Sequence, residues 1–189
     1  MYSRDLSLSV NNVQSRSHYK ELRFMFLFAV WYALLHTCYF LIPDGVLTQY
    51  LHHDCITSIV APAINLLSVT DTVLAHSNTI TSANTSLKVV RGCDGAGAVF
   101  LLMAGILAFK TTQKLKAIGI IIGLSLIYII NMLRIIGLFF ILEHRHSWFQ
   151  VVHTYLLPTF IVIICTIFFL WWTTLSTLDA RTDETDPPV

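Results

Sequence analysis

The chain has 189 residues, of which 55% are apolar and 12% are charged. Soluble domains contain about 25% charged residues. Half of that share, together with a mean hydropathy of +0.67, excludes an ordinary water-soluble domain and a disordered chain. The net charge is +1 and no run of Lys or Arg is long enough for a nucleic-acid-binding stripe, so we expect no nucleic-acid partner. The four cysteines form no CxxC pair, so no zinc or thioredoxin-type site is indicated and we expect no cofactor.

Four apolar stretches predict an all-α polytopic membrane protein with about four transmembrane helices. They cover residues 22–42, 94–109, 117–142 and 151–175. The first is too long for the apolar region of a signal peptide and no cleavage site follows it, so we expect a retained anchor. A single membrane-embedded domain is predicted over residues 22–175, between an N-terminal segment (1–21) and a flexible tail (176–189).

The positive residues are distributed unevenly around these stretches. Eight lie before or at the start of the first stretch, between the second and third, or in the tail: Arg4, Arg16, Lys20, Arg23, Lys110, Lys114, Lys116 and Arg181. Three lie in the other connecting segments: Lys88, Arg91 and Arg145. The positive-inside rule therefore predicts that both termini are cytoplasmic and that two segments lie outside.

Residues 43–92 form the larger of these two external segments. Apolar residues recur at helical spacing over residues 46–67, which predicts an interfacial helix, kinked or split at Pro62. A short membrane-inserted segment is the alternative. Residues 72–91 are rich in Thr, Ser and Asn and alternate near Leu87, which predicts a small β-hairpin with its turn at residues 78–84.

Arg134 lies inside the third apolar stretch. A guanidinium exposed to lipid costs about 3 kcal/mol or more, so we expect Arg134 to face the interior of the helix bundle. Asn131 lies three residues earlier on the same helical face and would form a polar patch with it. The alternative is an arginine whose side chain extends to the outer interface. On the same stretch, Gly119 and Gly123 form a small-xxx-small pair that favours close packing of a second helix, most simply an internal one.

Cys93 lies where the external segment meets the second apolar stretch, between Gly92 and Gly95. The positive end of a helix dipole lowers the pKa of a thiol and favours the nucleophilic thiolate, and the glycines permit a tight turn. A buried, inert thiol is the alternative. His153 opens the fourth stretch on the same side of the membrane, where a histidine can act as a general acid or base.

The other external histidines give a weaker signal. We expect His144 and His146, in the short second external segment, to be solvated, and His52 and His53 to lie on the interfacial helix. A metal site would have to combine His52, His53, Asp54, His144 and His146. None of these spacings is diagnostic of a metal site, so no metal is expected.

Cys93, Arg134 and His153 come from three different predicted helices and all reach the outer membrane face. A thiol, a cation and an imidazole together are typical of cysteine acyl transfer. The sequences RGCDGAGA around Cys93, NMLRI around Arg134 and HTYLLP at His153 resemble the exosortase/archaeosortase family, over about residues 89–172.

The resemblance implies a compact bacterial membrane cysteine protease or transpeptidase. It would cleave the C-terminal sorting signal of exported, membrane-anchored proteins, as in PEP-CTERM proteins, and transfer them to a lipid or glycan acceptor that the sequence does not identify. The resemblance also implies Cys93 as nucleophile, Arg134 as transition-state stabiliser and His153 as acid/base. From their positions beside these residues, we expect Asn131, Gly92 and Gly95 to support the site. The enzyme would lie in the bacterial inner membrane with its active site on the periplasmic side.

Three alternatives come from other functional classes. A small transporter would use Arg134 and His153 as a polar pathway and would not need Cys93. A membrane assembly or anchoring subunit would need none of the three residues. A thiol oxidoreductase would need two neighbouring external cysteines, and only Cys93 and Cys55 could supply them, without the usual spacing.

Overall fold

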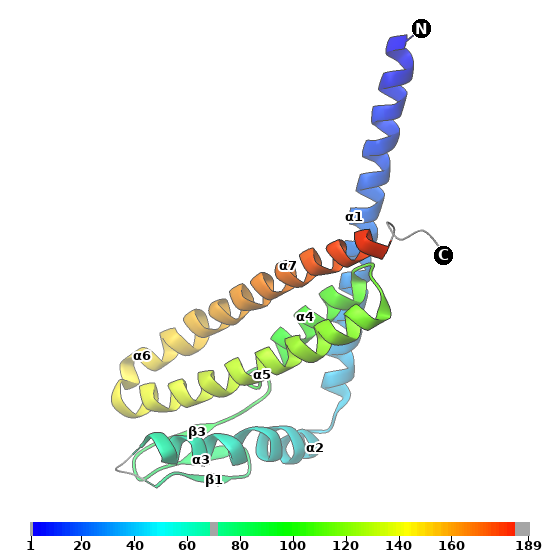
Figure 1. Ribbon diagram of the computed structural model, residues 1–189. Coiled ribbons are helices and arrows are strands. Elements are labelled where there is room, and N and C mark those ends of the chain that lie inside the picture. The colour runs from blue at the N-terminus through cyan, green and yellow to red at the C-terminus, as the bar shows by residue number, and fades with distance from the viewer. Residues whose placement is uncertain (1, 69–71, 184–189) are drawn as a thin grey trace.

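The computed structural model describes the backbone of residues 2–68 and 72–183, and the side chains of residues 18–68 and 72–178. Long helices dominate it (Figure 1): α1 (Tyr2–Leu41), α5 (Gln113–His144) and α7 (Leu157–Asp183). Two short elements, α6 (His146–Val151) and the π-helical η2 (Val152–Leu156), lead directly into α7. Within the described residues, three segments are long and apolar enough to cross a membrane, namely His18–Leu41, Gln113–His144 and His146–Leu178.

The second predicted span is shorter than expected. It forms α4 (Ala96–Ala108), whose 13 residues reach about 20 Å, against a bilayer core of about 30 Å. The glycine-rich turn before Ala96 delays its start, and the polar residues Lys110 and Thr111 follow its end. The predicted all-α polytopic membrane fold is therefore confirmed, with three long helices and a fourth, short helix that packs against α1, α5 and α7.

The glycines of α5 allow this close packing. A Cβ atom at Gly119 would lie 2.4 Å from Trp172 Nε1, and one at Gly123 would lie 2.6 Å from Leu102 Cδ2. Trp172 lies on α7 and Leu102 on α4, so the small-residue pair serves internal packing, as predicted.

A helical segment and a sheet form a layer that runs alongside α5, below it in the view of Figure 1. The helical segment comprises α2 (Asp44–Val46), the π-helical η1 (Leu47–Thr57) and α3 (Ser58–Leu67). Pro62 lies inside α3, which continues through it, so the predicted split does not occur there. The irregular hydrogen bonding of this segment lies instead in η1.

The sheet corrects the prediction of a hairpin. It has three antiparallel strands in the order β1-β2-β3: β1 (Leu74–His76), β2 (Thr79–Thr81) and β3 (Ser86–Lys88). The first turn is tighter than predicted because Ser77 adopts a positive φ of 54°. β2 thus lies where a turn was predicted, and its central residue, Ile80, is fully buried between two threonines.

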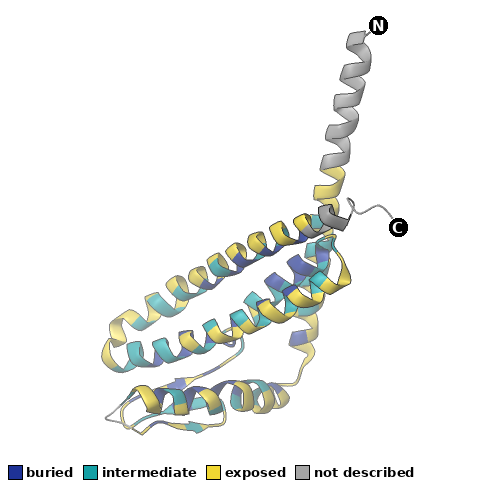
Figure 2. Cartoon of the chain, in the orientation of Figure 1, coloured by how far each residue is buried: buried dark blue, intermediate teal, exposed yellow. Residues whose placement is uncertain are grey.

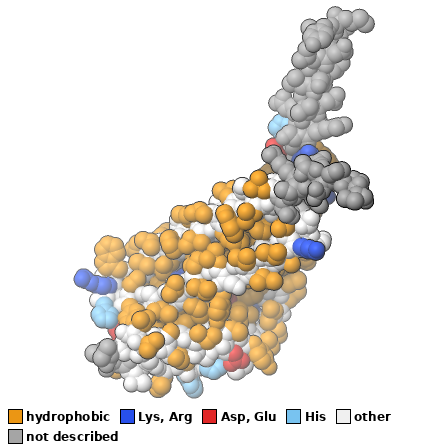
Figure 3. Space-filling view, in the orientation of Figure 1, with side chains coloured by type: hydrophobic (Ala, Val, Ile, Leu, Met, Phe, Trp, Pro, Cys, Tyr) orange, Lys and Arg blue, Asp and Glu red, His pale blue; other side chains and the backbone are white. Residues whose placement is uncertain are grey.

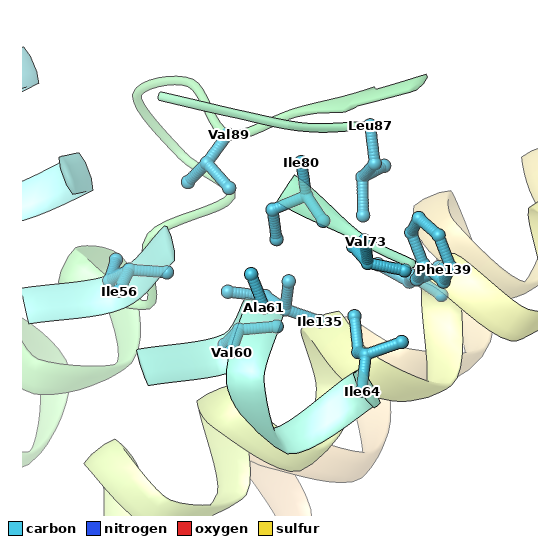
Figure 4. Close-up of a cluster of buried hydrophobic side chains, with 11 residues drawn as sticks. Ile56, Val60, Ala61, Ile64, Val73, Ile80, Leu87, Val89, Ile135 and Phe139 are labelled. Atoms are coloured by element: carbon cyan, nitrogen blue, oxygen red, sulfur yellow. The ribbon is translucent and has the colours of Figure 1, made fainter. Parts of the chain in front are cut away.

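The hydrophobic core of this layer joins α3, the sheet and α5 (Figure 4). Val60 and Ile64 of α3 and Ile80 of β2 are each 0% exposed, and Phe139 of α5 packs in the same cluster. Burying one such side chain stabilises the fold by about 1.5–3 kcal/mol. The layer is therefore attached firmly to the outer half of α5, close to Arg134.

Apolar side chains cover most of the visible face of the helices (Figure 3), and α5 and α7 expose residues along their outer sides (Figure 2). Exposed leucines, isoleucines and phenylalanines suit lipid rather than water. At the C-terminal end, α7 continues to Asp183, so residues 176–183 are helical where a flexible tail was predicted. The remainder of that tail lies outside the described residues, and α1 is helical from Tyr2 onward.

Candidate functional site

Cys93 and His153 meet directly. The Sγ atom of Cys93 lies 3.5 Å from Nε2 of His153, although 60 residues separate them in the chain. His153 lies in η2, and its ring stacks on that of Phe149 with a centroid distance of 5.4 Å and an interplanar angle of 3°. π-Helical turns are frequent at functional sites. The structure therefore forms a thiol–imidazole pair in which a neighbouring aromatic ring restrains the imidazole.

The environment of Cys93 differs from the prediction. Burial raises the pKa of the Cys93 thiol above its ordinary value, Arg134 opposes the shift through its charge, and Asp94 adds to it. The helix-dipole effect was overestimated because Cys93 lies in the turn before α4, whose N-cap is Gly95. The thiol must therefore lose its proton to a base, and His153 is the base within reach.

Arg134 lies inside the bundle, as predicted. It is 7% exposed, and its Nε atom has no hydrogen-bond partner among the described residues. Its positive charge opposes the rise in the pKa of the Cys93 thiol. The alternative of a side chain that extends to the interface is wrong, because Arg134 is buried within the bundle.

Asn131 holds the turn that carries Cys93. Its Nδ2 donates to the backbone oxygen of Asp94 at 3.0 Å, and Asn131 itself is 2% exposed. Gly95 permits this approach in two ways. Its φ of 83° lies in the left-handed region, and a Cβ atom there would lie 3.0 Å from Cγ of Asn131. Gly92 also has a positive φ of 88° but would meet nothing within 4 Å.

Sequence reasoning did not single out Asp94, which is the centre of a buried polar cluster. Its side chain is fully buried; it accepts a hydrogen bond from the Tyr39 hydroxyl, and Nε2 of His52 lies 3.3 Å from its Oδ2. Its Oδ1 accepts from the backbone N of Ala96 at 3.2 Å and so caps α4. The available signals were an acidic residue next to the cysteine and a His pair in an otherwise apolar helix.

Arg91 attaches the same turn to α1. Its Nη1 donates to the Tyr39 carbonyl at 2.9 Å, its Nη2 donates to the Ile42 carbonyl, and its Nε donates to Asp44 at 2.8 Å. The guanidinium also lies 5.1 Å from the centre of the Tyr39 ring. Carbonyl groups at a helix C-terminus lack intrahelical partners, so a cation is favourable there. Arg91 and Asp94 together fix the Cys93 turn against the end of α1.

Unsatisfied polar atoms gather at this site. Among the described side chains, five buried polar atoms lack a partner, and four of them belong to His52, Asn131, Arg134 and His153. Leaving such an atom without a partner costs about 1–3 kcal/mol. Their concentration beside Cys93 indicates a place where another molecule supplies hydrogen bonds.

A cavity of about 500 Å³ borders Asp94 and Asn131, between α1, η1, α4 and α5. Apolar residues form most of its wall, among them Phe100 and Met132. Cys93 is not among the described residues that line it. The cavity therefore places an apolar space against the two residues that hold the Cys93 turn.

The remaining histidines are not brought together. His53 lies 2.9 Å from the Ser77 carbonyl and connects η1 to the sheet, while His144 and His146 are exposed at the α5–α6 connection. The Nε2 atom of His52 interacts with Oδ2 of Asp94. Within the described part of the chain, no three His, Cys, Asp or Glu residues lie close enough to hold a metal ion.

Comparison with known proteins identifies a family. A family model described as transmembrane exosortase matches residues 21–172, which include Cys93, Arg134 and His153. Neither the curated proteins nor the solved structures gave a match. The match covers most of the chain and extends over most of each apolar span in its described part, so this multi-pass membrane protein belongs to the transmembrane exosortase family.

Proposed function

We propose that the protein is a membrane cysteine transpeptidase that cleaves a PEP-CTERM-like C-terminal sorting signal from exported proteins. The observation that carries this proposal is the contact of 3.5 Å between Cys93 Sγ and His153 Nε2, beside a buried Arg134. A nucleophile and a base within hydrogen-bond reach are what acyl transfer requires. The membership of the chain in the exosortase family supports the same chemistry.

The first half-reaction uses all three residues. His153 accepts the thiol proton on Nε2, and the Cys93 sulfur attacks the carbonyl carbon of the scissile peptide bond. The positive charge of Arg134 stabilises the oxyanion that forms. The protonated His153 then donates its proton to the leaving nitrogen as the C–N bond breaks. The products are a Cys93 thioester and the released C-terminal helix.

The second half-reaction regenerates the thiol. An acceptor amine or hydroxyl group, or water, loses a proton to His153 and attacks the thioester carbonyl. The C–S bond breaks, and His153 returns the proton to the sulfur. Transfer to a lipid or glycan gives a processed, re-anchored protein, while water gives simple hydrolysis.

The membrane placement belongs to the same proposal. The distribution of Lys and Arg supports a cytoplasmic location of both termini and an external location of the Cys93 turn. In the proposed bacterial inner membrane, the Cys93 turn would lie on the periplasmic side. A substrate anchored by its own C-terminal helix would diffuse laterally in the bilayer and present its motif at that face. The partners are therefore exported, membrane-anchored proteins and the surrounding lipid.

Coexpression with a tail-anchored substrate tests the proposal. Cys93→Ala and His153→Ala should abolish processing, as seen by the size of the substrate on an immunoblot. Arg134→Ala should reduce the rate by about 10²–10³, as for the loss of one oxyanion donor. Arg134→Lys should not restore it, because Lys lacks the planar fork of donors.

Cys55→Ala is the matched control, because it removes an exposed thiol on the same side of the protein and should process substrate normally. Undiminished processing by Cys93→Ala would eliminate the mechanism. Such a result would favour the transporter or assembly-subunit alternatives, which do not use that thiol. A loss of processing in Cys55→Ala alone would show that the nucleophile is misassigned.

A further inference from the structure

A second hollow lies at the end of the helices away from Cys93. It has a volume of about 1330 Å³ and is bounded by α1, the C-terminal end of α4, the α4–α5 connection and α7. Its apolar wall includes Phe24 and Leu27 of α1, Phe109 and Phe169. The rings of Phe24 and Phe109 each lie 6.4 Å from that of Phe169, so the wall is continuous from α1 to α7.

The polar residues of this hollow are mostly cations. Lys20 and Arg23 come from α1, while Lys110 and Lys116 come from the α4–α5 region. Glu21 is the one acidic residue among the described residues that line it. The amino group of Lys116 donates to the Leu107 carbonyl at 2.8 Å and so caps the end of α4. Lys20, Arg23 and Lys110 are exposed, which leaves three cations to face a ligand.

The apolar wall and the exposed cations together indicate which kind of ligand fits this hollow. Ligand cavities for drug-sized molecules are about 300–1,000 Å³, so this hollow suits something larger. Its wall is apolar and aromatic, which favours acyl chains, while the positive charge favours a phosphate group. Basic pockets between transmembrane helices bind anionic lipid headgroups in this way. Free phosphate would pair with the cations of the hollow but would leave its apolar wall uncovered.

We propose that this hollow binds one anionic phospholipid from the adjacent bilayer leaflet. Its phosphate lies between Lys20, Arg23 and Lys110, and its acyl chains cover the wall formed by Phe24, Phe109 and Phe169. The lipid links α1 to the α4–α5 connection, two segments far apart in the sequence.

Native mass spectrometry of the full chain in detergent micelles tests this. The probes are phosphatidylglycerol, phosphatidylcholine with the same acyl chains, and deacylated glycerophosphoglycerol. We expect phosphatidylglycerol to remain bound and the other two to be lost. Each removed cation should weaken binding about fivefold, so Lys110→Gln should lose about fivefold in affinity. The double variant Lys20→Gln/Lys110→Gln should lose about 25-fold, since two such factors multiply.

Lys114→Gln is the matched control. Lys114 lies in the first turn of α5, is exposed and does not line the hollow, yet its substitution removes the same charge from the same region. It should bind phosphatidylglycerol as the unmodified chain does. Equal losses for Lys114→Gln and Lys110→Gln would overturn the proposal in favour of general charge attraction. Equal retention of phosphatidylcholine, or of the deacylated headgroup, would overturn it as well.

Discussion

Substitution of Gly95 by alanine is expected to damage both the fold and the site. At a φ of 83°, a left-handed alanine costs about 1–2 kcal/mol in backbone strain. The new Cβ atom would also lie 3.0 Å from Cγ and 3.2 Å from Oδ1 of Asn131. Asn131 must move, which weakens its bond to the Asp94 carbonyl and adds about 0.5–1.5 kcal/mol.

Gly92→Ala is the control for the cost of backbone strain at a positive φ. Its φ of 88° is nearly the same, but a Cβ atom there meets nothing within 4 Å. Gly92→Ala should therefore cost only the strain of about 1–2 kcal/mol. Thermal unfolding of the purified protein in detergent measures the difference, since 1 kcal/mol shifts the melting temperature of a chain of this size by about 2–4 °C. Substrate processing should fall further in Gly95→Ala, because the Cys93 turn moves away from His153.

A double-mutant cycle isolates the steric term. In an Asn131→Ala background the space beside Gly95 is free, so Gly95→Ala should there cost no more than Gly92→Ala does. Equal melting temperatures for Gly92→Ala and Gly95→Ala would refute the steric argument. So would an unchanged cost of Gly95→Ala when Asn131 is replaced.

Three further predictions concern packing, the nucleophile and the buried cluster. Gly119→Ala should lower the free energy of unfolding by about 1–3 kcal/mol, because its Cβ atom would lie 2.4 Å from the indole nitrogen of Trp172 on α7. Gly137→Ala on the same helix is the control: its Cβ atom would have no neighbour within 4 Å, so it should not destabilise the protein in the same thermal assay. In a variant whose other cysteines are serine, the rate of Cys93 alkylation by iodoacetamide should rise with pH, with a midpoint above that of an ordinary thiol. Arg134→Ala should move this midpoint higher, because it removes the charge that opposes the rise in the pKa of Cys93. An unmoved midpoint would contradict the effect of that charge on the thiol. Asp94→Ala leaves a buried imidazole and a buried hydroxyl without their partner, so it should cost about 1–3 kcal/mol for each of them in chemical unfolding. Asp94→Asn keeps an acceptor and should cost less, and equal losses for the two variants would argue against the hydrogen-bonded cluster.

The candidate site residues could be singled out from the sequence because two of them are anomalous where they stand. Arg134 is a charge inside an apolar helix, and Cys93 lies among glycines at the start of another. Their partnership with His153 was inferred from chemistry, and the contact between Cys93 and His153 confirms that those two meet. The long helices were predictable for a simpler reason, since continuous apolar stretches have few other stable conformations in a membrane.

Contacts between distant segments could not be predicted in the same way. Asp94 pairs with Tyr39 and His52, which are 55 and 42 residues away, and no local pattern connects them. The strand β2 escaped detection because its single buried apolar residue, Ile80, stands among polar neighbours that are typical of a turn. The pKa of Cys93 depends on how deeply the turn is buried, which is a property of the packed helices.

The attachment of the Cys93 turn to α1 also has a consequence for the order of events during synthesis. The Tyr39 hydroxyl donates to Asp94, and the Ile42 carbonyl just after α1 accepts from Arg91, and both of these partners are made about 50 residues later. A nascent chain that ends before Arg91 therefore lacks these contacts at the end of its first helix, however well that helix is inserted. These contacts join the Cys93 turn to the end of α1, so the turn has its full set of partners only in chains whose first helix is already in place.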